Sequence, residues 1–298
     1  IESVVLGKPD IVQLLVTCLL AGEHLLLEDV PGVGKTLAAK AMSQSIKGDF
    51  ARLQFTPDLL PSDITGSVIY RSDTRDFVFS PGPIFANVVL ADEVNRAPPR
   101  TQSALLEAMS ESRVSIDGAT HELPKPFIVV ATQNPFEYEG TYTLPESQLD
   151  RFLMRTSIGY PQREIERTVL QTHRQGESVD KLEPVVSTED LLEAQQAARD
   201  VQFDETLVDY LLNIVEATRK HEGFQVGVST RGALSFYRGC QARAITEGRD
   251  YVTPDDVKEL SVPCLAHRVL PRGIFQGANR TEVEAELSDV IQEIPVPI

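Results

Sequence analysis

The chain has 298 residues, of which 42% are hydrophobic and 24% are charged, as in a soluble globular protein. This length allows one large or two ordinary domains, each with its own core. The formal net charge of -16 at pH 7 argues against a broad nucleic-acid-binding surface, because such a surface would repel phosphate backbones. A local basic pore is still compatible with this charge.

The three cysteines, Cys18, Cys240 and Cys264, lie far apart in apolar stretches, and we interpret them as core thiols of a protein in a reducing compartment. The five histidines lack the spacing of metal ligands. The most apolar early run, residues 11–21, is too short to span a bilayer, and no signal peptide opens the chain. We therefore expect a cytoplasmic protein. The chain begins at Ile1 rather than Met, which leaves room for a further N-terminal segment.

The first predicted elements are a helix over residues 9–21 and a short strand over residues 24–27. Apolar residues at positions 11, 14, 15, 18 and 19 have helical spacing. The run His-Leu-Leu-Leu at 24–27 is too short for a buried helix and suits a strand covered on both faces. A second helix is predicted over residues 35–46.

The segment between this strand and the second helix, EDVPGVGKT at residues 28–36, has the pattern of a phosphate-binding loop. Gly32 and Gly34 allow a tight turn that presents backbone N–H groups inward, and the following helix directs the positive end of its dipole to the same point. Lys35 would reach the β- and γ-phosphates, and the Thr36 hydroxyl would ligate Mg²⁺. We predict nucleotide contacts from Pro31, Gly32, Val33, Gly34, Lys35, Thr36 and Leu37.

One position of this loop departs from the G-x-x-x-x-G-K-[ST] pattern, because Asp29 replaces the first Gly. Asp adopts left-handed backbone angles less readily than Gly, so the substitution bears on the entry turn of the loop.

The second chemical motif is Asp92-Glu93, which follows a predicted buried strand over residues 88–91. The carboxyl ends of strands in an open α/β sheet are where ligands bind. Asp92 would hold Mg²⁺ through water, and Glu93 would orient and polarise the water that attacks the γ-phosphate. The alternative is a solvated strand end without a catalytic role.

Another buried strand is predicted over residues 127–132, and Asn134 follows it. Asn134 is therefore expected at the same sheet edge as Asp92, where it could hydrogen-bond the attacking water or the γ-phosphate. A turn-capping Asn before Pro135 is the alternative.

Two hairpins are predicted on either side of the Asp92-Glu93 motif. After a strand over 51–55 and a short helix starting at Pro61, β-like runs at 67–70 and 77–79 flank the polar segment 71–76, which fits a protruding hairpin. After a helix over 99–111, residues 114–121 carry the turn signal Asp117-Gly118.

The rest of the chain is predicted to be mostly helical. Residues 149–152 are placed on a short helix and 155–158 on a fifth strand, and the change in composition near Pro161 indicates a domain boundary. Asp204 and Thr253 are predicted N-caps. Arg231 lies in the first turn of a predicted helix, where it opposes the helix dipole, and this favours a functional anion nearby. Helices are predicted over 163–175, 189–199, 205–221, 231–247, 254–268 and, more weakly, 282–291.

Five motifs at these spacings resemble those of an AAA+ ATPase, and their residues are similar to those of the MoxR family. They are LLLEDVPGVGKT, VLADEVNRAPPRTQSALLEAM, VVATQNP, LPESQLDRF and GVSTRGAL. The resemblance implies an α/β fold, with a five-stranded parallel sheet ordered 5-1-4-3-2 followed by an all-α lid. The hairpin at 67–79 would be the helix-2 insert, and the one at 114–123 the hairpin before sensor 1. The implied domains are a nucleotide-binding domain at 1–160, a lid at 161–270 and a C-terminal tail at 271–298.

The same resemblance implies roles for three more residues. Asn134 matches sensor 1, Arg231 matches sensor 2, and Arg151 matches the arginine finger that is given to a neighbouring subunit. Arg96 and Arg155 are rivals of Arg151 for that role. Asp29 is commonplace in the family.

The function that we expect is hydrolysis of Mg-ATP by a homo-oligomeric, hexameric ring that remodels, assembles or activates protein clients. The resemblance implies a partner with a von Willebrand factor A domain. Two alternatives stay open at this stage. One is the motor subunit of a metal chelatase, and the other is a nucleotide-gated scaffold without meaningful turnover.

Overall fold

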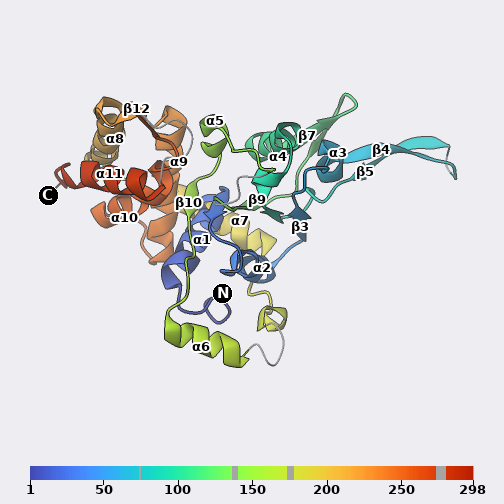
Figure 1. Cartoon of the computed structure of the whole chain (residues 1–298), viewed down its shortest axis with the longest axis horizontal. Coiled ribbons are helices and arrows are strands. Elements are labelled where there is room, and N and C mark those ends of the chain that lie inside the picture. Colours follow the sequence, from blue (N-terminus) through green and yellow to red (C-terminus); the bar gives the residue numbers. More distant parts are fainter. Residues whose placement is uncertain (74, 136–139, 173–177, 273–279, 298) are drawn as a thin grey trace. The chain divides into compact units, whose positions relative to one another are not determined.

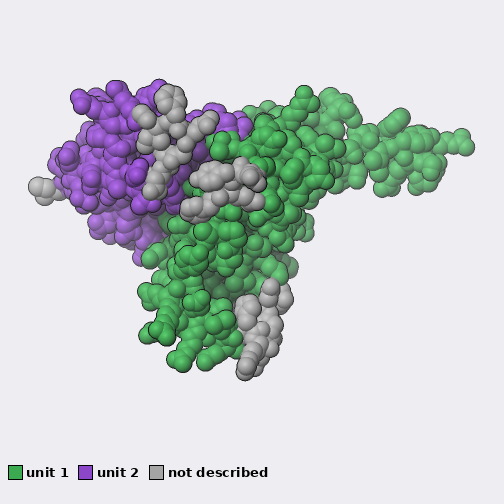
Figure 2. Space-filling model, in the orientation of Figure 1, with its two compact units in different colours: residues 1–15, 24–144, 156–192 green, residues 16–23, 145–155, 193–298 purple. Residues whose placement is uncertain are grey.

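The computed structural model describes residues 1–73, 75–135, 140–172, 178–272 and 280–297 (Figure 1). The chain divides into two compact units (Figure 2). Unit 1 comprises residues 1–15, 24–144 and 156–192. Unit 2 comprises residues 16–23, 145–155 and 193–298.

The main sheet has the strand order β10-β1-β9-β6-β3, which is 5-1-4-3-2 in chain order and confirms the predicted topology. Its strands are β1 (Leu25–Glu28), β3 (Phe50–Gln54), β6 (Val88–Asp92), β9 (Ile128–Gln133) and β10 (Met154–Thr156). Every residue of β1 and β6 is buried, because apolar side chains on both faces of a parallel sheet are covered. Strands β1, β3, β6 and β9 form the core of unit 1.

The register of the sheet brings the polar strand ends to one edge. Within unit 1, β1 pairs in parallel with β9, β9 with β6, and β6 with β3. In this register Gln54 lies beside Asp92, and Glu28 lies beside Gln133. Parallel pairing therefore gathers the carboxyl ends of four strands at the edge where the sequence predicts a nucleotide site.

The described part of unit 1 also contains several helices and two 3-10 turns, one of which is η3 (Ser178–Lys181). Helix α1 (Pro9–Ala21) matches its predicted range, although its C-terminal half groups with unit 2. Helix α2 (Lys35–Gln44) follows the Gly-rich loop, and α4 (Pro99–Glu111) follows the 3-10 turn η1 (Val94–Arg96). Helices α3 (Pro61–Thr65) and α6 (Arg163–Thr172) are also present. A short strand β2 (Ile46–Lys47) pairs in parallel with β11 (Val186–Ser187).

Both predicted hairpins are confirmed. Strands β4 (Gly66–Arg71) and β5 (Asp76–Pro81) form a long antiparallel ribbon that extends away from the sheet of unit 1 (Figure 1). Its outer part carries an exposed aromatic pair, Tyr70 and Phe77, with ring centroids 5.3 Å apart. The second hairpin consists of β7 (Arg113–Ile116) and β8 (Ala119–Glu122). The ring of Phe79 on β5 stacks on that of His121 on β8, with the ring centroids 3.9 Å apart, so the two hairpins are in contact.

Unit 2 is helical, as predicted for the C-terminal half. It contains α5 (Glu146–Leu149), most of α7 (Thr188–Arg199), α8 (Glu205–Lys220), α9 (Thr230–Thr246), α10 (Pro254–Leu265) and α11 (Arg280–Gln292). Strands β12 (Phe224–Val226) and β13 (Leu270–Pro271) pair in antiparallel fashion. The predicted N-caps are confirmed, because Asp204 accepts a hydrogen bond from Thr206 N and Thr253 precedes α10.

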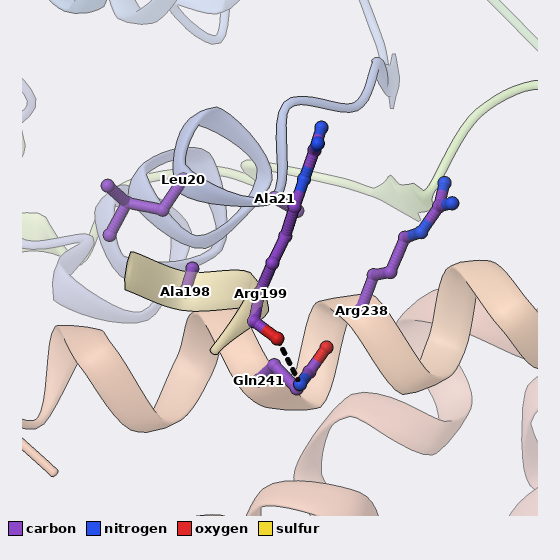
Figure 3. A pocket seen from close by; sticks show the side chains of 6 residues that line it. All are labelled: Leu20, Ala21, Ala198, Arg199, Arg238 and Gln241. Atoms are coloured by element: carbon purple, nitrogen blue, oxygen red, sulfur yellow. Dashed lines mark hydrogen bonds between the residues drawn. The ribbon is translucent and has the colours of Figure 1, made fainter. Parts of the chain in front are cut away.

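The C-terminal half of α1 packs inside unit 2. Figure 3 shows a small pocket there, between the ends of α1 and α7 and the side of α9. Gln241 donates hydrogen bonds to the carbonyl oxygens of Arg199 and Val201, at 3.0 and 2.8 Å. Arg238 pairs with Glu23 just after α1. The pocket is lined by Leu20, Ala21, Ala198, Arg199, Arg238 and Gln241.

The three cysteines are buried free thiols in unit 2, as predicted. Burial raises the pKa of all three thiols, and raises that of Cys264 to about 12. A buried thiol with a raised pKa stays protonated and inert. Among the described residues, no helix is both long and apolar enough to cross a membrane.

Three segments differ from the sequence prediction. Helix α5 ends at Leu149, so Asp150, Arg151 and Phe152 follow a helix instead of lying on one. The fifth strand is Met154–Thr156 rather than 155–158. The two units do not divide at residue 160, because residues 145–155 group with unit 2 and residues 156–192 with unit 1. The predicted end of the 163–175 helix lies partly outside the described residues.

We predict that Gly82, at the base of the first hairpin, does not tolerate a side chain. A Cβ atom at Gly82 would collide with Ile64 O and Gly66 N, which are backbone atoms and cannot move aside. Gly82→Ala should lower the free energy of unfolding by about 3 kcal/mol, the upper end for overpacking. Urea unfolding measures this change.

Gly118→Ala is the matched control, because its Cβ would meet open space and only its left-handed φ of +81° would be strained. That variant should lose only about 1–2 kcal/mol. Equal losses in the two variants would contradict the predicted collision at Gly82.

Candidate nucleotide-binding site

The loop between β1 and α2 is a Gly-rich turn at the carboxyl edge of the sheet. Gly32 and Gly34 have left-handed φ angles of +85° and +95°, where glycine carries no steric penalty. An added Cβ at either position would meet nothing within 4 Å, so the loop surface is open there. Gly34 is the N-cap of α2, and Ala38 N donates to its carbonyl oxygen. The loop thus ends at a helix N-terminus, which attracts anions.

Asp29 anchors the entry of this loop. One of its carboxylate oxygens accepts a hydrogen bond from Val30 N at 2.8 Å, and the other accepts one from Gly159 N at 2.6 Å. Its own N–H donates to Gln133 O. Asp29 is absent from the described non-glycine residues with positive φ, so the left-handed angle that would disfavour Asp is not required. The departure from the loop pattern is therefore accommodated by hydrogen bonds.

Lys35 begins α2 and its side chain turns back onto the loop. Its ammonium group donates to the carbonyl oxygens of Asp29 and Val30. Burial lowers the pKa of Lys35, while the carboxylates of Asp29, Asp92 and Glu93 act in the opposite direction. The Lys35 ammonium is thus a buried positive charge that interacts with three carboxylates of the site.

Asp92, the last residue of β6, joins three elements through its carboxylate. Oδ1 accepts a hydrogen bond from the Thr132 hydroxyl at 2.6 Å. Oδ2 accepts one from Arg52 at 2.7 Å and lies 3.5 Å from the hydroxyl oxygen of Thr36. Asp92 is buried at 6% exposure, so these donors offset the desolvation of its charge. The carboxylate is fixed beside the first turn of α2.

Glu93 has an unusual backbone for its residue type. Its φ and ψ of 58° and 52° lie in the left-handed region, and its N–H donates to the Thr132 hydroxyl at 2.9 Å. Its Oε2 accepts hydrogen bonds from Gln54 at 2.9 Å and from Arg96 at 3.1 Å. A non-glycine residue held in this region by its surroundings is typical of functional sites.

Asn134 lies directly after β9 and is buried at 8% exposure. Asn95 Nδ2 donates to its backbone carbonyl at 3.2 Å. Lys35, Thr36, Asp92 and Glu93 thus come together in unit 1, with Asn134 on the adjacent strand end. Pro31, Gly32, Val33, Gly34 and Leu37 form the loop and the first helical turn around them.

The side chains at this edge fit a magnesium-bound nucleotide. Thr36 Oγ1 and Asp92 Oδ2 are hard oxygen donors, which Mg²⁺ prefers. The open glycine loop, the helix N-terminus and the Lys35 ammonium supply the groups that bind phosphates.

Arg151 and Arg231 belong to unit 2. Arg151 is half-buried and follows α5, whereas Arg231 is exposed in the first turn of α9, as predicted. The structure of unit 2 places them on two segments that are joined by hydrogen bonds through Asp150 and Ser229.

Sequence reasoning missed Thr132, Arg52 and Gln54. Thr132 touches both acids of the motif, and the other two residues contact one acid each. Polar residues at 52 and 54 on a predicted strand, and Thr132 at the end of an apolar run, were the available signals. Their partners lie about 40 residues away in sequence and became evident only in the sheet register.

The comparisons with known proteins agree with this geometry. Residues 24–154 match the family described as "ATPase family associated with various cellular activities (AAA)", and residues 216–293 match the AAA lid domain. By its fold and these matches, the chain is therefore a member of the AAA+ ATPase class.

Relatives identify the branch of this class. YeaC of Bacillus subtilis is 48% identical, and the alignment covers 100% of this chain and 93% of the relative. The chaperone MoxR1 of Mycobacterium tuberculosis is 41% identical over 100% of this chain and 80% of its own length. A solved structure from Cytophaga hutchinsonii has a TM-score of 0.88 and 37% identity, covering 100% of this chain and 92% of that one. The chain belongs to the MoxR family of AAA+ ATPases.

We predict that Thr132 is essential to the shape of this site. Thr132→Val keeps the side-chain volume but removes the donor to Asp92 and the acceptor for Glu93 N. Leaving two buried polar groups unpaired should lower the free energy of unfolding by about 2–4 kcal/mol and weaken Mg²⁺-dependent nucleotide binding. Urea unfolding and calorimetry measure the two effects.

Thr132→Ser retains the hydroxyl and should stay within about 1.5 kcal/mol of the parent protein, the cost of a small cavity. Binding by Thr132→Val at the parental affinity would contradict this assignment.

Proposed function

We propose that this chain hydrolyses Mg-ATP as a subunit of a hexameric homo-oligomeric ring in the cytoplasm. Hydrolysis would drive the remodelling, assembly or activation of a protein client, in cooperation with a partner that bears a von Willebrand factor A domain. The observation that carries the ATPase proposal is the 3.5 Å approach of Thr36 Oγ1 to Asp92 Oδ2 beside the glycine loop, with Glu93 next in sequence. Three buried free thiols support a reducing compartment.

Binding would begin at the loop. The backbone N–H groups of residues 31–37 would surround the phosphates, and Lys35 would exchange the carbonyl oxygens of Asp29 and Val30 for phosphate oxygens. Thr36 and Asp92 would hold Mg²⁺, which would neutralise phosphate charge. Fixing the phosphates before the reaction removes the reorganisation that the same step requires in water.

Hydrolysis would use Glu93 to orient the attacking water and accept its proton. The carboxylate is already positioned by Gln54 and Arg96, and the backbone by Thr132. Asn134, at the end of the adjacent strand, would hydrogen-bond the water or the γ-phosphate. Since two donors compete with water for Glu93, we expect the isolated chain to turn over slowly.

Two arginines of unit 2 would respond to the γ-phosphate. Arg151 would act on the nucleotide of a neighbouring subunit, and Arg231 on the nucleotide of its own chain. Of the rivals to Arg151, Arg96 pairs with Glu93 of its own chain, and Arg155 lies within strand β10. These placements favour Arg151 as the residue that reaches another subunit.

The first hairpin is the proposed client contact. Its outer part combines the exposed polar residues 71–73 and 75–76 with the aromatic pair Tyr70 and Phe77, which are 57% and 69% exposed. Exposed aromatic side chains on a projecting ribbon are typical of protein contacts. The Phe79–His121 stack would pass movement of one hairpin to the other.

We predict that Lys35 and Glu93 act at different steps. Lys35→Ala should abolish nucleotide binding, because the ammonium that faces the phosphates is lost. Glu93→Gln should bind ATP normally and hydrolyse it about 100-fold or more slowly, since proton acceptance is lost. Fluorescent-nucleotide binding and phosphate release measure the two steps.

Glu111→Gln makes the same chemical change at the exposed end of α4 and serves as the control. It should match the parent chain in both assays. If Glu93→Gln also released phosphate at the parental rate, the assigned role of Glu93 would be wrong. If the parent chain bound ATP but did not hydrolyse it, the chain would instead be a nucleotide-gated scaffold.

The hairpin proposal predicts a separation of two activities. Replacing residues 71–76 by a short Gly-Ser turn, or Tyr70 and Phe77 by Ala, should leave basal ATPase and ring assembly intact and abolish partner-dependent activity. The reason is that this ribbon projects from the sheet, whereas the described side chains of the site in unit 1 come from other elements.

Leu212→Ala, at an exposed apolar position of α8, is the control for loss of surface hydrophobicity. Maturation of the partner at the parental level by both hairpin variants would show that the client is engaged elsewhere.

A further inference from the structure

A buried arginine holds the segment that carries Arg151. Arg268 lies three residues after the end of α10, and its side chain is 1% exposed. Nε donates to Asp150 Oδ1 at 2.8 Å, and the two terminal nitrogens donate to the carbonyl oxygens of Asp150, Phe152, Leu153 and Cys264. Three of these four carbonyls belong to residues 150–153. A planar guanidinium with this many acceptors leaves its neighbours little freedom.

His267 also contacts the segment 150–153. His267 Nε2 lies 3.0 Å from Phe152 O, and burial together with the adjacent positive charge of Arg268 lowers the pKa of His267. Neighbouring residues 267 and 268 thus contact the backbone on both sides of Arg151. This network ties residues 150–153 to the helical unit 2, with which they group.

The hydrogen-bond network around Arg268 extends to the N-terminus of α9, the helix that carries Arg231. Asp150 Oδ2 accepts a hydrogen bond from the Ser229 hydroxyl at 3.2 Å. The same hydroxyl accepts from Gly232 N at 2.9 Å as the N-cap of α9. An Asp could cap this helix equally well but could not donate to Asp150, whereas Ser does both.

Close packing adds a buried contact between Arg268 and α9. A Cβ atom at Gly232 would lie 2.7 Å from Arg268 Cδ and 3.1 Å from its Nε. Arg268 cannot easily move aside, because its hydrogen bonds pin it. Gly232 therefore leaves room for the Arg268 side chain and for Val228 Cγ1, which would lie 2.9 Å from an added Cβ.

We propose that Arg268, with Asp150, Ser229 and Gly232, positions Arg151 and couples it to Arg231. The inference rests on the proposed function, in which these two arginines serve different nucleotides. Because these four residues fix the segment of Arg151 to the first turn of α9, Arg151 and Arg231 move together. Binding or loss of a chain's own γ-phosphate at Arg231 would then change the position of Arg151 in the pocket of the next subunit.

The test isolates the trans-acting arginine in mixed rings. Arg151→Ala subunits keep an intact pocket, and Lys35→Ala subunits supply Arg151 without binding nucleotide, so the mixture should regain ATPase activity. Adding Gly232→Ala to the Lys35→Ala subunit should reduce the regained kcat about tenfold or more, with KM for ATP unchanged, because the working pocket belongs to the other subunit.

Gly239→Ala in the same Lys35→Ala background is the matched control. It is the same change in the same helix, but its Cβ would meet only ordinary contacts at 3.4 Å and beyond, none of them with Arg268. Ser229→Asp retains the cap and loses the donor, so it should also reduce the regained activity, whereas Ser229→Thr should not. Full activity with Gly232→Ala and Ser229→Asp, in rings shown to form, would overturn the proposal.

Amide hydrogen exchange separates this proposal from the proposed function. The amides of Arg151 and Phe152 donate to Gln148 O and Leu149 O, and they should exchange about tenfold faster in Gly232→Ala than in Gly239→Ala. If the mixture of Arg151→Ala and Lys35→Ala subunits fails to regain activity, the trans role of Arg151 is wrong. Faster exchange in Gly232→Ala would still support the positioning of the Arg151 segment by Arg268 and its neighbours. Equal exchange rates in the two variants would refute the coupling, whatever the ATPase result.

Discussion

The arrangement of the site depends on the buried carboxylate of Asp92. A charge at 6% exposure needs donors, and here they come from β9, β3 and the first turn of α2. These contacts fix the distance between the sheet edge and the glycine loop. They also fix Glu93, because its N–H shares the Thr132 hydroxyl that bonds Asp92. One buried acid therefore sets the geometry of both the proposed metal-binding position and the proposed water-orienting position.

The main elements could be predicted because their signals are local. Short apolar runs ending in polar residues gave the buried strands, and Asp117-Gly118 gave the second hairpin. The loop from Pro31 to Thr36 was evident from residue types alone. Asp92 and Glu93 were found because a pair of acids at the end of an apolar run has few structural uses.

What could not be predicted depends on distant partners. The fit of Asp29 in place of Gly relies on Gly159 N, 130 residues away. The position of residues 150–153 relies on Arg268, which the sequence places as an ordinary charged residue at the end of a predicted helix. The grouping of residues 150–153 with unit 2 has the same origin, because the hydrogen bonds from Arg268 tie this segment to unit 2.

The central claim is that this edge of the sheet binds Mg-ATP through Lys35, Thr36 and Asp92. A crystal structure of Glu93→Gln with Mg-ATP tests it most directly. We predict Mg²⁺ bonded to the Thr36 hydroxyl and held by Asp92, directly or through water, with Lys35 moved from the carbonyl oxygens of Asp29 and Val30 onto the phosphates. Nucleotide bound away from the glycine loop, or Lys35 still on those carbonyls beneath bound phosphates, would contradict the account.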